Sequence, residues 1–186
     1  MKFKNQIEQW KYKAIETNFA KQVINKLKHN KLFRIIYREM EKLIAQKMLE
    51  EIKKYPVPQH LAIIMDGNRR YALLQGMPPY KGHEIGKDKL EEVIEWSHEV
   101  GIKVLTVFAF STDNFKRSKE EVEHLMNLFE KDLKKLANDK RVHENQVKIK
   151  VIGNIQLLPK HVRKAAIEVM EKTKNYNRYF FNIAIG

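Results

Sequence analysis

The 186-residue sequence contains no cysteine, and this absence sets the first limits on its chemistry. A chain without thiols forms no disulfides and offers no thiolate ligand to a metal. The sequence also lacks any apolar run near the roughly 20 residues that a membrane-spanning helix requires. Its first residues, MKFKNQIEQWKYKAIE, have no apolar segment of the kind found in signal peptides. We therefore expect a cytoplasmic protein.

Glycine and proline are absent from the first 55 residues, although the whole chain contains 7 glycines and 5 prolines. The segment YPVPQH (55–60) then introduces two prolines, each of which disfavours helical backbone at the preceding residue. We place a boundary there, between a helical extension (1–55) and a second domain (56–186). Within the extension, apolar residues recur at helical spacing and predict one or two amphipathic helices. They are Leu32, Ile36, Met40, Leu43 or Ile44, and Met48.

Positive charge is in large excess, +13 at pH 7. The extension holds 14 Lys or Arg and 6 Glu, so its net charge of +8 is more than half of the total. Such a field attracts polyanions, diphosphates or anionic lipid. Two interpretations of the extension remain open. It is either a solvated pair of helices packed on the rest of the protein, or a membrane-surface helix whose basic side meets lipid headgroups.

Residues 60–185 alternate between strand-like and helix-like patterns. The strand-like segments are 60–65, 102–110, 147–152 and 179–185, and the helix-like segments between them are 86–100, 118–137 and 159–173. Ser118 and Glu121 have the spacing of a capping box at the start of the second helix. The order β-α-β-α-β-α-β predicts an α/β fold, a mainly parallel sheet with flanking helices.

Two loops in this order have an unusual composition. MDGNRRYA (65–72) follows the first strand, and STDNFKRS (111–118) follows the second. Because ligands of open parallel sheets bind at the carboxyl ends of the strands, both loops are expected to face one crevice. There Asp66 offers a hard oxygen ligand to a divalent cation. Planar guanidinium groups that match phosphate oxygens come from Arg69, Arg70 and Arg117.

Two further residues complete this predicted metal and diphosphate site. Gly67 lets the backbone approach a ligand closely. His83, in GHEIG, is expected near the N-terminus of the next helix, where backbone N–H groups favour an anion. Each residue taken alone has a structural explanation, as a turn former, a solvated cation or a packing residue. The expected meeting of both loops at one edge favours the functional interpretation.

Three segments of the sequence resemble the cis-prenyltransferases, the undecaprenyl diphosphate synthase family. They are HLAIIMDGNRRYA, KGHEIG and LTVFAFSTDNFKRSKEEVEHLM. The Arg-Arg-Tyr variant, NFKRSKEEV, and LLP followed by TKNYN are similar to the archaeal and eukaryotic branch. The resemblance covers about residues 60–186. It implies an α/β sheet in a protein that is usually a homodimer.

The resemblance also implies a reaction. Isopentenyl diphosphate is condensed repeatedly with an allylic diphosphate, typically geranylgeranyl diphosphate in the archaeal branch, and new cis double bonds form. The product is a long-chain, undecaprenyl-type polyprenyl diphosphate, the precursor of a glycosyl carrier lipid. The growing chain needs an apolar channel, and the predicted helices 86–100 and 118–137 are candidates to line it, although core packing explains their apolar stripes equally well.

Residue roles are carried over by motif. Asp66 matches the aspartate that binds Mg²⁺ and assists departure of the allylic diphosphate. Asn114 takes the position sometimes assigned as proton acceptor, but a neutral amide has little basicity, so orienting a substrate while pyrophosphate takes the proton is the competing role. The substrate-binding residues implied by the resemblance are Gly67, Asn68, Arg69, Arg70, Tyr71, His83, Ser111, Thr112, Asp113, Phe115 and Arg117.

The sequence departs from the family pattern in places. Tyr71 and Phe115 stand where the family usually has tryptophan, and Pro79 replaces a usual arginine, so that one diphosphate contact is lost or supplied by Lys81. The family continues past NIAIG into a Tyr-Gly-Gly-Arg-type segment, an arginine cluster for isopentenyl diphosphate, and a glutamate that completes the Mg²⁺ site. We therefore expect an N-terminal fragment, inactive alone and without much of the dimer interface.

Two alternatives come from other functional classes. The chain can be a non-catalytic partner subunit, although such subunits usually lose the Asp-Gly-Asn-Arg loop that is intact at residues 66–69. The charge of +13 also suggests nucleic-acid binding as a possible function. However, the chain has no recognisable nucleic-acid-reading motif, and its basic excess lies mostly in the extension. We expect no nucleic-acid partner.

Overall fold

The structure, a computed structural model, describes residues 30–185. The chain divides into two units after Tyr55, and each is described by itself. In the first unit the described part is one helix, α3 (Lys31–Lys53). Asn30 caps it, because its side-chain oxygen accepts hydrogen bonds from the backbone N–H groups of Leu32 and Phe33. The earlier part of the expected helical extension lies outside the described residues.

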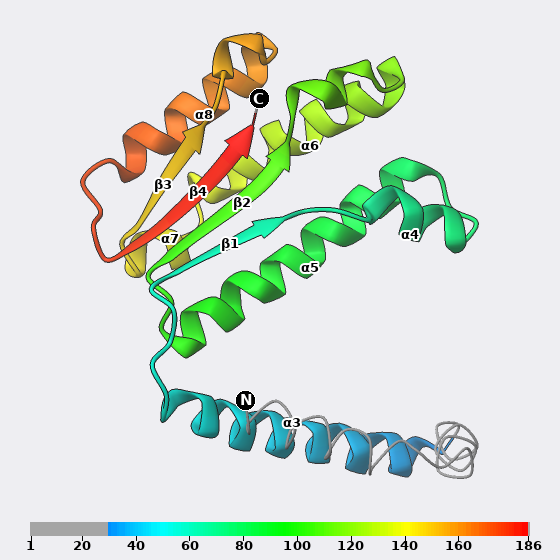
Figure 1. Cartoon of the computed structure of the whole chain (residues 1–186), viewed down its shortest axis with the longest axis vertical. Helices are drawn as coiled ribbons and strands as arrows, with labels where there is room; N and C mark the ends of the chain where they lie inside the picture. Colours follow the sequence, from blue (N-terminus) through cyan, green and yellow to red (C-terminus); the bar gives the residue numbers. More distant parts are fainter. Residues whose placement is uncertain (1–29, 186) are drawn as a thin grey trace. The chain divides into compact units, whose positions relative to one another are not determined.

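The second unit is built on a four-stranded sheet in the order β1-β2-β4-β3 (Figure 1). Every neighbouring pair of strands is parallel, which confirms the predicted α/β fold with a parallel sheet. The strand segments expected from the sequence are also confirmed, within two residues at each end. The strands are β1 (His60–Ile64), β2 (Val104–Phe110), β3 (Val147–Ile152) and β4 (Tyr179–Ile185).

Helical segments connect the strands. Between β1 and β2 lie α4 (Asn68–Leu74) and α5 (Pro79–Val100). Between β2 and β3 lie the 3₁₀ helix η1 (Thr112–Lys116), α6 (Lys119–Leu136) and α7 (Lys140–Glu144). Between β3 and β4 lie the 3₁₀ helix η2 (Ile155–Leu157) and α8 (Lys160–Thr173). The sequence predicted α6 and α8 closely, but it missed α4, α7 and the first seven residues of α5.

One face of the sheet carries the hydrophobic core. Successive residues of a strand point to opposite faces, so burial alternates along each strand. On the core face, Val107 and Ile149 are buried, whereas Ile64 and Phe108, on the other face, are 74% and 41% exposed. The core is completed by buried apolar residues of α6 and α8. They include Leu125, Met126, Leu133, Val162, Ala165, Ala166 and Val169.

Two glycines explain why α5 begins earlier than expected. Gly82 and Gly86, which look like loop residues in GHEIG, lie one turn apart in the helix, and both face Asn68 at the start of α4. A Cβ atom at Gly82 would overlap the backbone carbonyl of Asn68, and one at Gly86 would lie 2.5 Å from its side-chain Oδ1. The glycines therefore allow α4 to pack closely against α5.

Gly82→Ala should destabilise the protein more than Gly86→Ala. At Gly82 the obstacle is backbone, which cannot turn aside, and overpacking of this kind costs about 1–3 kcal/mol. At Gly86 the obstacle is a side-chain amide that can rotate, and alanine gains up to about 1 kcal/mol of helix propensity over glycine. Urea unfolding of both variants checks the order. Equal stability of Gly82→Ala and wild type would contradict the close packing.

Candidate functional site

Both predicted loops leave the same edge of the sheet. β1 and β2 are adjacent and parallel, so the segments after Ile64 and Phe110 emerge side by side. The backbone N–H of Met65 still donates to the carbonyl of Phe108, at 3.2 Å, which ties the start of the first loop to β2. The expected shared edge is therefore confirmed.

Asp66 sits on this edge with a solvent-exposed carboxylate. Its Oδ1 accepts a hydrogen bond from the Gly67 N–H at 2.5 Å, and its Oδ2 accepts one from Arg70 Nη2 at 3.0 Å. The Gly67 hydrogen bond, followed by Arg70, lowers the pKa of Asp66 below its ordinary value. Gly67 has φ of +87°, in the left-handed region that glycine adopts without strain. The loop thus presents an ionised carboxylate.

Glu121 is the centre of the site, and sequence reasoning did not assign it a functional role. Its carboxylate is 7% exposed, and one oxygen, Oε1, contacts three basic side chains. These are His83 Nε2 at 3.0 Å, Arg117 Nη1 at 2.9 Å and Arg69 Nε at 3.4 Å. We call these four residues the Glu121 cluster. It joins side chains from α4, α5, α6 and the end of η1.

The capping box predicted for Ser118 and Glu121 forms only in part. Ser118 Oγ accepts the hydrogen bond from the Glu121 N–H at 3.3 Å, as expected. The Glu121 carboxylate, however, binds the cluster cations, since a buried charge needs partners of opposite sign. The Arg117-to-Glu121 spacing of four residues was a signal in the sequence that pointed to an ion pair.

His83 lies in the second turn of α5, because that helix begins at Pro79. The expectation that it sits at the helix N-terminus was therefore wrong. Burial lowers the pKa of His83, against the opposing hydrogen bond to Glu121. Burial raises the pKa of Glu121, but the His83 hydrogen bond and the charges of Arg69 and Arg117 outweigh it and lower the pKa overall. Near neutral pH the cluster thus holds one carboxylate, two guanidinium groups and a neutral imidazole, a net positive charge.

In the second loop, several predicted site residues have local partners. Asn114 Oδ1 accepts a hydrogen bond from the Ser111 N–H at 3.1 Å, which completes a capping box on η1. Asp113 pairs with Lys116 at 2.7 Å, and both side chains are about 80% exposed. The Phe115 ring packs edge-on against Phe110 with ring centres 4.9 Å apart. These contacts hold the loop in shape beside the cluster.

Two other predicted site residues, and the two residues discussed for the missing arginine, are placed as follows. Tyr71, on α4, is 49% exposed, and Thr112 is also exposed. Lys81, the residue considered as a substitute for the arginine missing at Pro79, pairs with Glu84 at 2.8 Å. Pro79 is the first residue of α5, a position that suits proline because it has no backbone N–H to satisfy.

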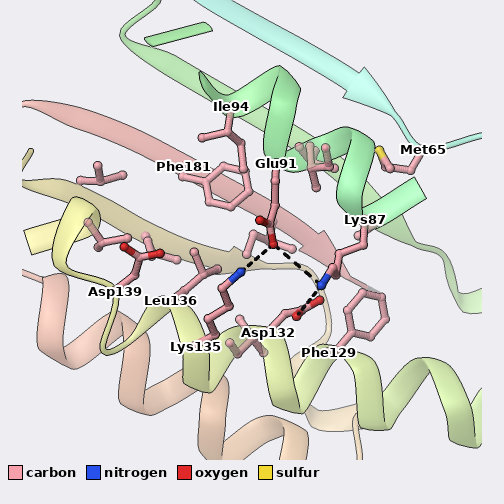
Figure 2. Close-up of a pocket in the computed structure, with 18 of the residues that line it drawn as sticks. Met65, Lys87, Glu91, Ile94, Phe129, Asp132, Lys135, Leu136, Asp139 and Phe181 are labelled. Carbon is pink, nitrogen blue, oxygen red and sulfur yellow. Dashed lines mark hydrogen bonds and ion pairs between the residues drawn. The ribbon is translucent and has the colours of Figure 1, made fainter. Parts of the chain in front are cut away.

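A cavity of about 420 Å³ begins at the site and runs between α5 and α6 over the core face of the sheet (Figure 2). Met65, Asn68 and His83 line the end that meets the site. The two helices expected to line an apolar channel do line this cavity. Most of its apolar lining comes from Leu90, Ile94, Val107, Leu125, Phe129, Leu133, Leu136, Ile149, Phe181, Ile183 and Ile185.

The comparison with known proteins identifies the family. A family model described as "Putative undecaprenyl diphosphate synthase" matches residues 64–186. The chain belongs to the undecaprenyl diphosphate synthase family of cis-prenyltransferases. This confirms the resemblance seen in the sequence motifs.

Two curated relatives of this chain come from archaea. A tritrans,polycis-undecaprenyl-diphosphate synthase (geranylgeranyl-diphosphate specific) of Pyrococcus furiosus is 52% identical over 152 residues, 82% of this chain and 58% of that protein. The protein of the same name from Methanocaldococcus jannaschii is 52% identical over 144 residues, 77% of this chain and 51% of its own length. The chain therefore spans about half the length of these relatives.

A solved structure supports the fold. Lavandulyl diphosphate synthase from Lavandula x intermedia, crystallised with dimethylallyl diphosphate, aligns with a TM-score of 0.62 and 30% identity. The alignment covers 73% of this chain and 56% of that one. The four-stranded parallel sheet with its helices is thus the α/β fold of the cis-prenyltransferases.

The described residues offer few ligands that could hold a metal together. Within residues 30–185, His, Asp and Glu residues form no group of three that would hold a metal ion. Asp66 therefore belongs to no such group among these residues. That fits Mg²⁺, which proteins often bind through one or two carboxylates together with substrate phosphates.

None of the described helices has the length and apolar character needed to cross a membrane.

Glu121→Gln should destabilise the protein by about 1–3 kcal/mol, because the partly buried Arg117 and the almost buried His83 side chain lose their charged partner. Glu120→Gln, at the exposed neighbouring position, is the matched control. Denaturant unfolding at pH 7 measures both. The Glu121 cluster would lose its structural importance if the two variants were equally stable.

Acid should weaken the cluster in two stages. His83 and Glu121 both have folded pKa values below their ordinary values of 6.5 and 4.5. The stability that each group contributes is therefore fully present above its ordinary pKa and is lost as the pH falls through its lower, folded pKa. The loss begins with His83 and continues with Glu121. Thermal melts between pH 7.5 and pH 3.5 test this (a range chosen about these two values). In Glu121→Gln the loss below about pH 4.5 should be smaller than in wild type.

Proposed function

We propose that this protein is a Mg²⁺-dependent cis-prenyltransferase that extends an allylic diphosphate with successive isopentenyl diphosphate units. The single observation that carries the proposal is the junction of a cationic cluster with an apolar cavity beside Asp66. An allylic diphosphate has these two parts, a charged head and an apolar tail. Residues 56–186 then form the N-terminal part of the catalytic domain.

The substrate and product follow from the relatives. The archaeal proteins are named as synthases of undecaprenyl diphosphate that are specific for geranylgeranyl diphosphate. We propose the same primer for this protein, and a long-chain polyprenyl diphosphate product that serves as a precursor of glycosyl carrier lipid. The alternative, a non-catalytic partner subunit, is disfavoured by those names and by the intact loop at Asp66. The comparisons also give no reason to propose nucleic-acid binding.

The diphosphate head binds at the loop edge in this proposal. Arg69, Arg70 and Arg117 donate hydrogen bonds to its oxygens, and the cluster's net positive charge favours the anion. Asn68 and His83 lie where the head meets the tail, since both line the end of the cavity. The tail then lies along the apolar wall between α5 and α6. In this proposal the exposed Tyr71 lies beside the head, and Ser111, Thr112, Asp113 and Phe115 line the substrate loop.

Catalysis depends on the charge that develops as the allylic diphosphate leaves. Arginine donors stabilise that charge where it forms. Asp66 would hold Mg²⁺, which would supply Lewis-acid stabilisation of the same leaving group. The alkene of isopentenyl diphosphate attacks the allylic carbon and then loses a proton. Asn114 orients a substrate, since its amide is neutral and its Oδ1 already accepts a hydrogen bond from the Ser111 N–H. Pyrophosphate accepts the proton.

Asp66→Ala in the complete enzyme should lower incorporation of labelled isopentenyl diphosphate by more than about 100-fold, as expected when a group that stabilises developing charge is lost. Little loss of fold is expected, because the Asp66 side chain is 76% exposed. Asp88→Ala, whose side chain is similarly exposed at 74%, is the control. Incorporation near the wild-type level by Asp66→Ala would reject the proposed function.

We also propose that the complete enzyme is a cytoplasmic homodimer and that α3 associates with a membrane surface. The motivation is the apolar side of α3, where Leu32, Ile36, Met40 and Leu43 are between 50% and 65% exposed. A surface helix of this kind would hold the enzyme where a lipid product is needed.

Removing residues 1–55 should abolish flotation of the enzyme with anionic liposomes. A finer test replaces Ile36 and Leu43 together by glutamine, which removes apolar contact area and should weaken flotation several-fold. Ala45→Gln places the same side chain on the opposite side of the helix and serves as the control. Equal flotation of full-length and truncated enzyme would exclude a membrane role for the extension.

A further inference from the structure

Two adjacent leucines at the end of α4 are exposed to solvent. Leu73 is 63% exposed and Leu74 is 84% exposed, the highest value for a large apolar side chain in residues 30–185. Single exposed apolar residues are normal on a protein surface, whereas a contiguous group calls for an explanation. The turn that follows extends the group with the partly exposed Met77 and the exposed Pro78. We call residues 73–78 the α4 tip.

The packing of α4 explains why this side of the helix is uncovered. Ala72 is buried, and a Cβ atom at Gly82 of α5 would lie 3.0 Å from its Cβ. Leu74 follows Ala72 by about 200° of rotation around the helix, so it points away from α5. Figure 1 shows α4 beyond the end of β1, beside the start of α5. The tip therefore protrudes from the same edge of the sheet as the candidate site.

The backbone of the tip is paired by its own hydrogen bonds. The Gly76 N–H donates to the Leu73 carbonyl at 3.0 Å, and the Met77 N–H donates to the Ala72 carbonyl at 2.8 Å, which are the two bonds of a Schellman motif. The Gln75 N–H also donates to the Ala72 carbonyl, at 3.0 Å. Unpaired backbone groups are costly in an apolar environment. A turn whose N–H groups are paired internally avoids that cost.

Positive charge surrounds the tip. The segment from residue 67 to residue 83 contains no acidic residue and three cations, Arg69, Arg70 and Lys81. Arg70 and Lys81 pair with the carboxylates of Asp66 and Glu84, but these ion pairs are exposed and therefore weak. The cations thus remain able to bind anions from outside the protein.

The spacing of charge and apolar surface suits a lipid headgroup layer. Arg70 precedes Leu74 by four residues, which is about 6 Å along the helix. A helix at a membrane surface buries its apolar side about 5–10 Å into the boundary between headgroups and acyl chains, while its cations stay with the anionic headgroups. With Leu74 at that depth, Arg70 lies at the level of the lipid phosphates.

The size of the tip favours a bilayer over a protein partner. Each side of a stable protein interface buries roughly 800 Å², and two leucines with Met77 and Pro78 do not supply that area. A bilayer sets no such minimum, since binding strength grows with whatever apolar area enters it and with attraction to anionic lipid. The proposed substrate and product both have long hydrocarbon tails, so they collect in bilayers as well.

We propose that the α4 tip inserts into the surface of an anionic bilayer and thereby seats the diphosphate-binding edge of the enzyme at the lipid headgroups. The reason for meeting a bilayer rests on the proposed function, in which a long-tailed allylic diphosphate reaches the site from the membrane. Leu73 and Leu74 do not touch the reacting atoms. The few side chains of the tip add to the membrane affinity proposed for the extension and do not replace it.

The first test measures insertion directly. The chain contains no cysteine, so Leu74→Cys introduces one thiol for a polarity-sensitive dye. In the complete enzyme, freed of any other thiol, vesicles of phosphatidylglycerol and phosphatidylcholine should shift the dye emission to the blue. Lipids that carry a nitroxide near the headgroup should quench it. Ile167→Cys, on α8 and 48% exposed, is the matched control and should show neither change.

Two outcomes of this test would overturn the insertion. One is a dye at position 74 whose emission does not change when the vesicles are added. The other is a thiol at position 74 that the dye cannot reach, because protein would then cover the tip. Vesicles of phosphatidylcholine alone should give a smaller shift than anionic vesicles, since the cations around the tip attract anionic lipid.

The second test measures the consequence for catalysis. Leu73→Gln with Leu74→Gln should raise the KM for geranylgeranyl diphosphate held in anionic vesicles about tenfold, or about 1.4 kcal/mol. The KM and kcat for geranyl diphosphate without vesicles should not change, and Ile167→Gln should behave as wild type with both substrates. An equal rise of both KM values would place the effect in the site itself and would overturn the inference.

The same double variant should unfold in urea at the wild-type concentration, because both leucines are exposed. A lower stability would show that the tip packs against protein in the complete enzyme, and would also overturn the insertion. Failure of the proposed function is distinguishable. Absence of isopentenyl incorporation in wild type would reject that function, and the dye measurement, which needs no catalysis, would still decide whether the tip enters the bilayer.

Discussion

The candidate site depends on one buried carboxylate. A charge that is removed from water must be paired, and Glu121 meets this requirement through Arg69, His83 and Arg117. These residues come from three different segments, so the single carboxylate fixes α4, the second turn of α5 and the end of η1 relative to α6. One carboxylate between two guanidinium groups gives a net positive charge. The same arrangement therefore suits a diphosphate.

The cluster also depends on close packing between α4 and α5. Arg69 follows Asn68 directly, and Asn68 can approach α5 only because Gly82 and Gly86 have no side chains. His83 lies between those glycines on the same helix. The contact between Asn68 and the two glycines therefore places an arginine and a histidine together at Glu121. A loss of that packing would disturb the site without touching any charged residue.

Helices α5 and α6 serve the head and the tail of the proposed substrate in different ways. At their site end they supply His83 and Glu121, and along their length they border the apolar cavity. The cavity is lined both by ion pairs, such as Glu91–Lys135 at 2.7 Å, and by apolar side chains of the two helices and the sheet.

The sequence by itself determined the strands, their order along the chain and the shared edge of the two loops, because apolar alternation and βαβ order are local and repetitive signals. The order of the strands within the sheet came from the structure. Its motifs also identified the family. Only the tertiary structure decided that α5 begins at Pro79, that His83 lies in its second turn and that Glu121 gathers the cations. The reason is separation along the chain. The contact with Asn68 explains why positions 82 and 86 hold glycine, and the partner of His83 is Glu121, 38 residues away. These residues meet only when the helices pack.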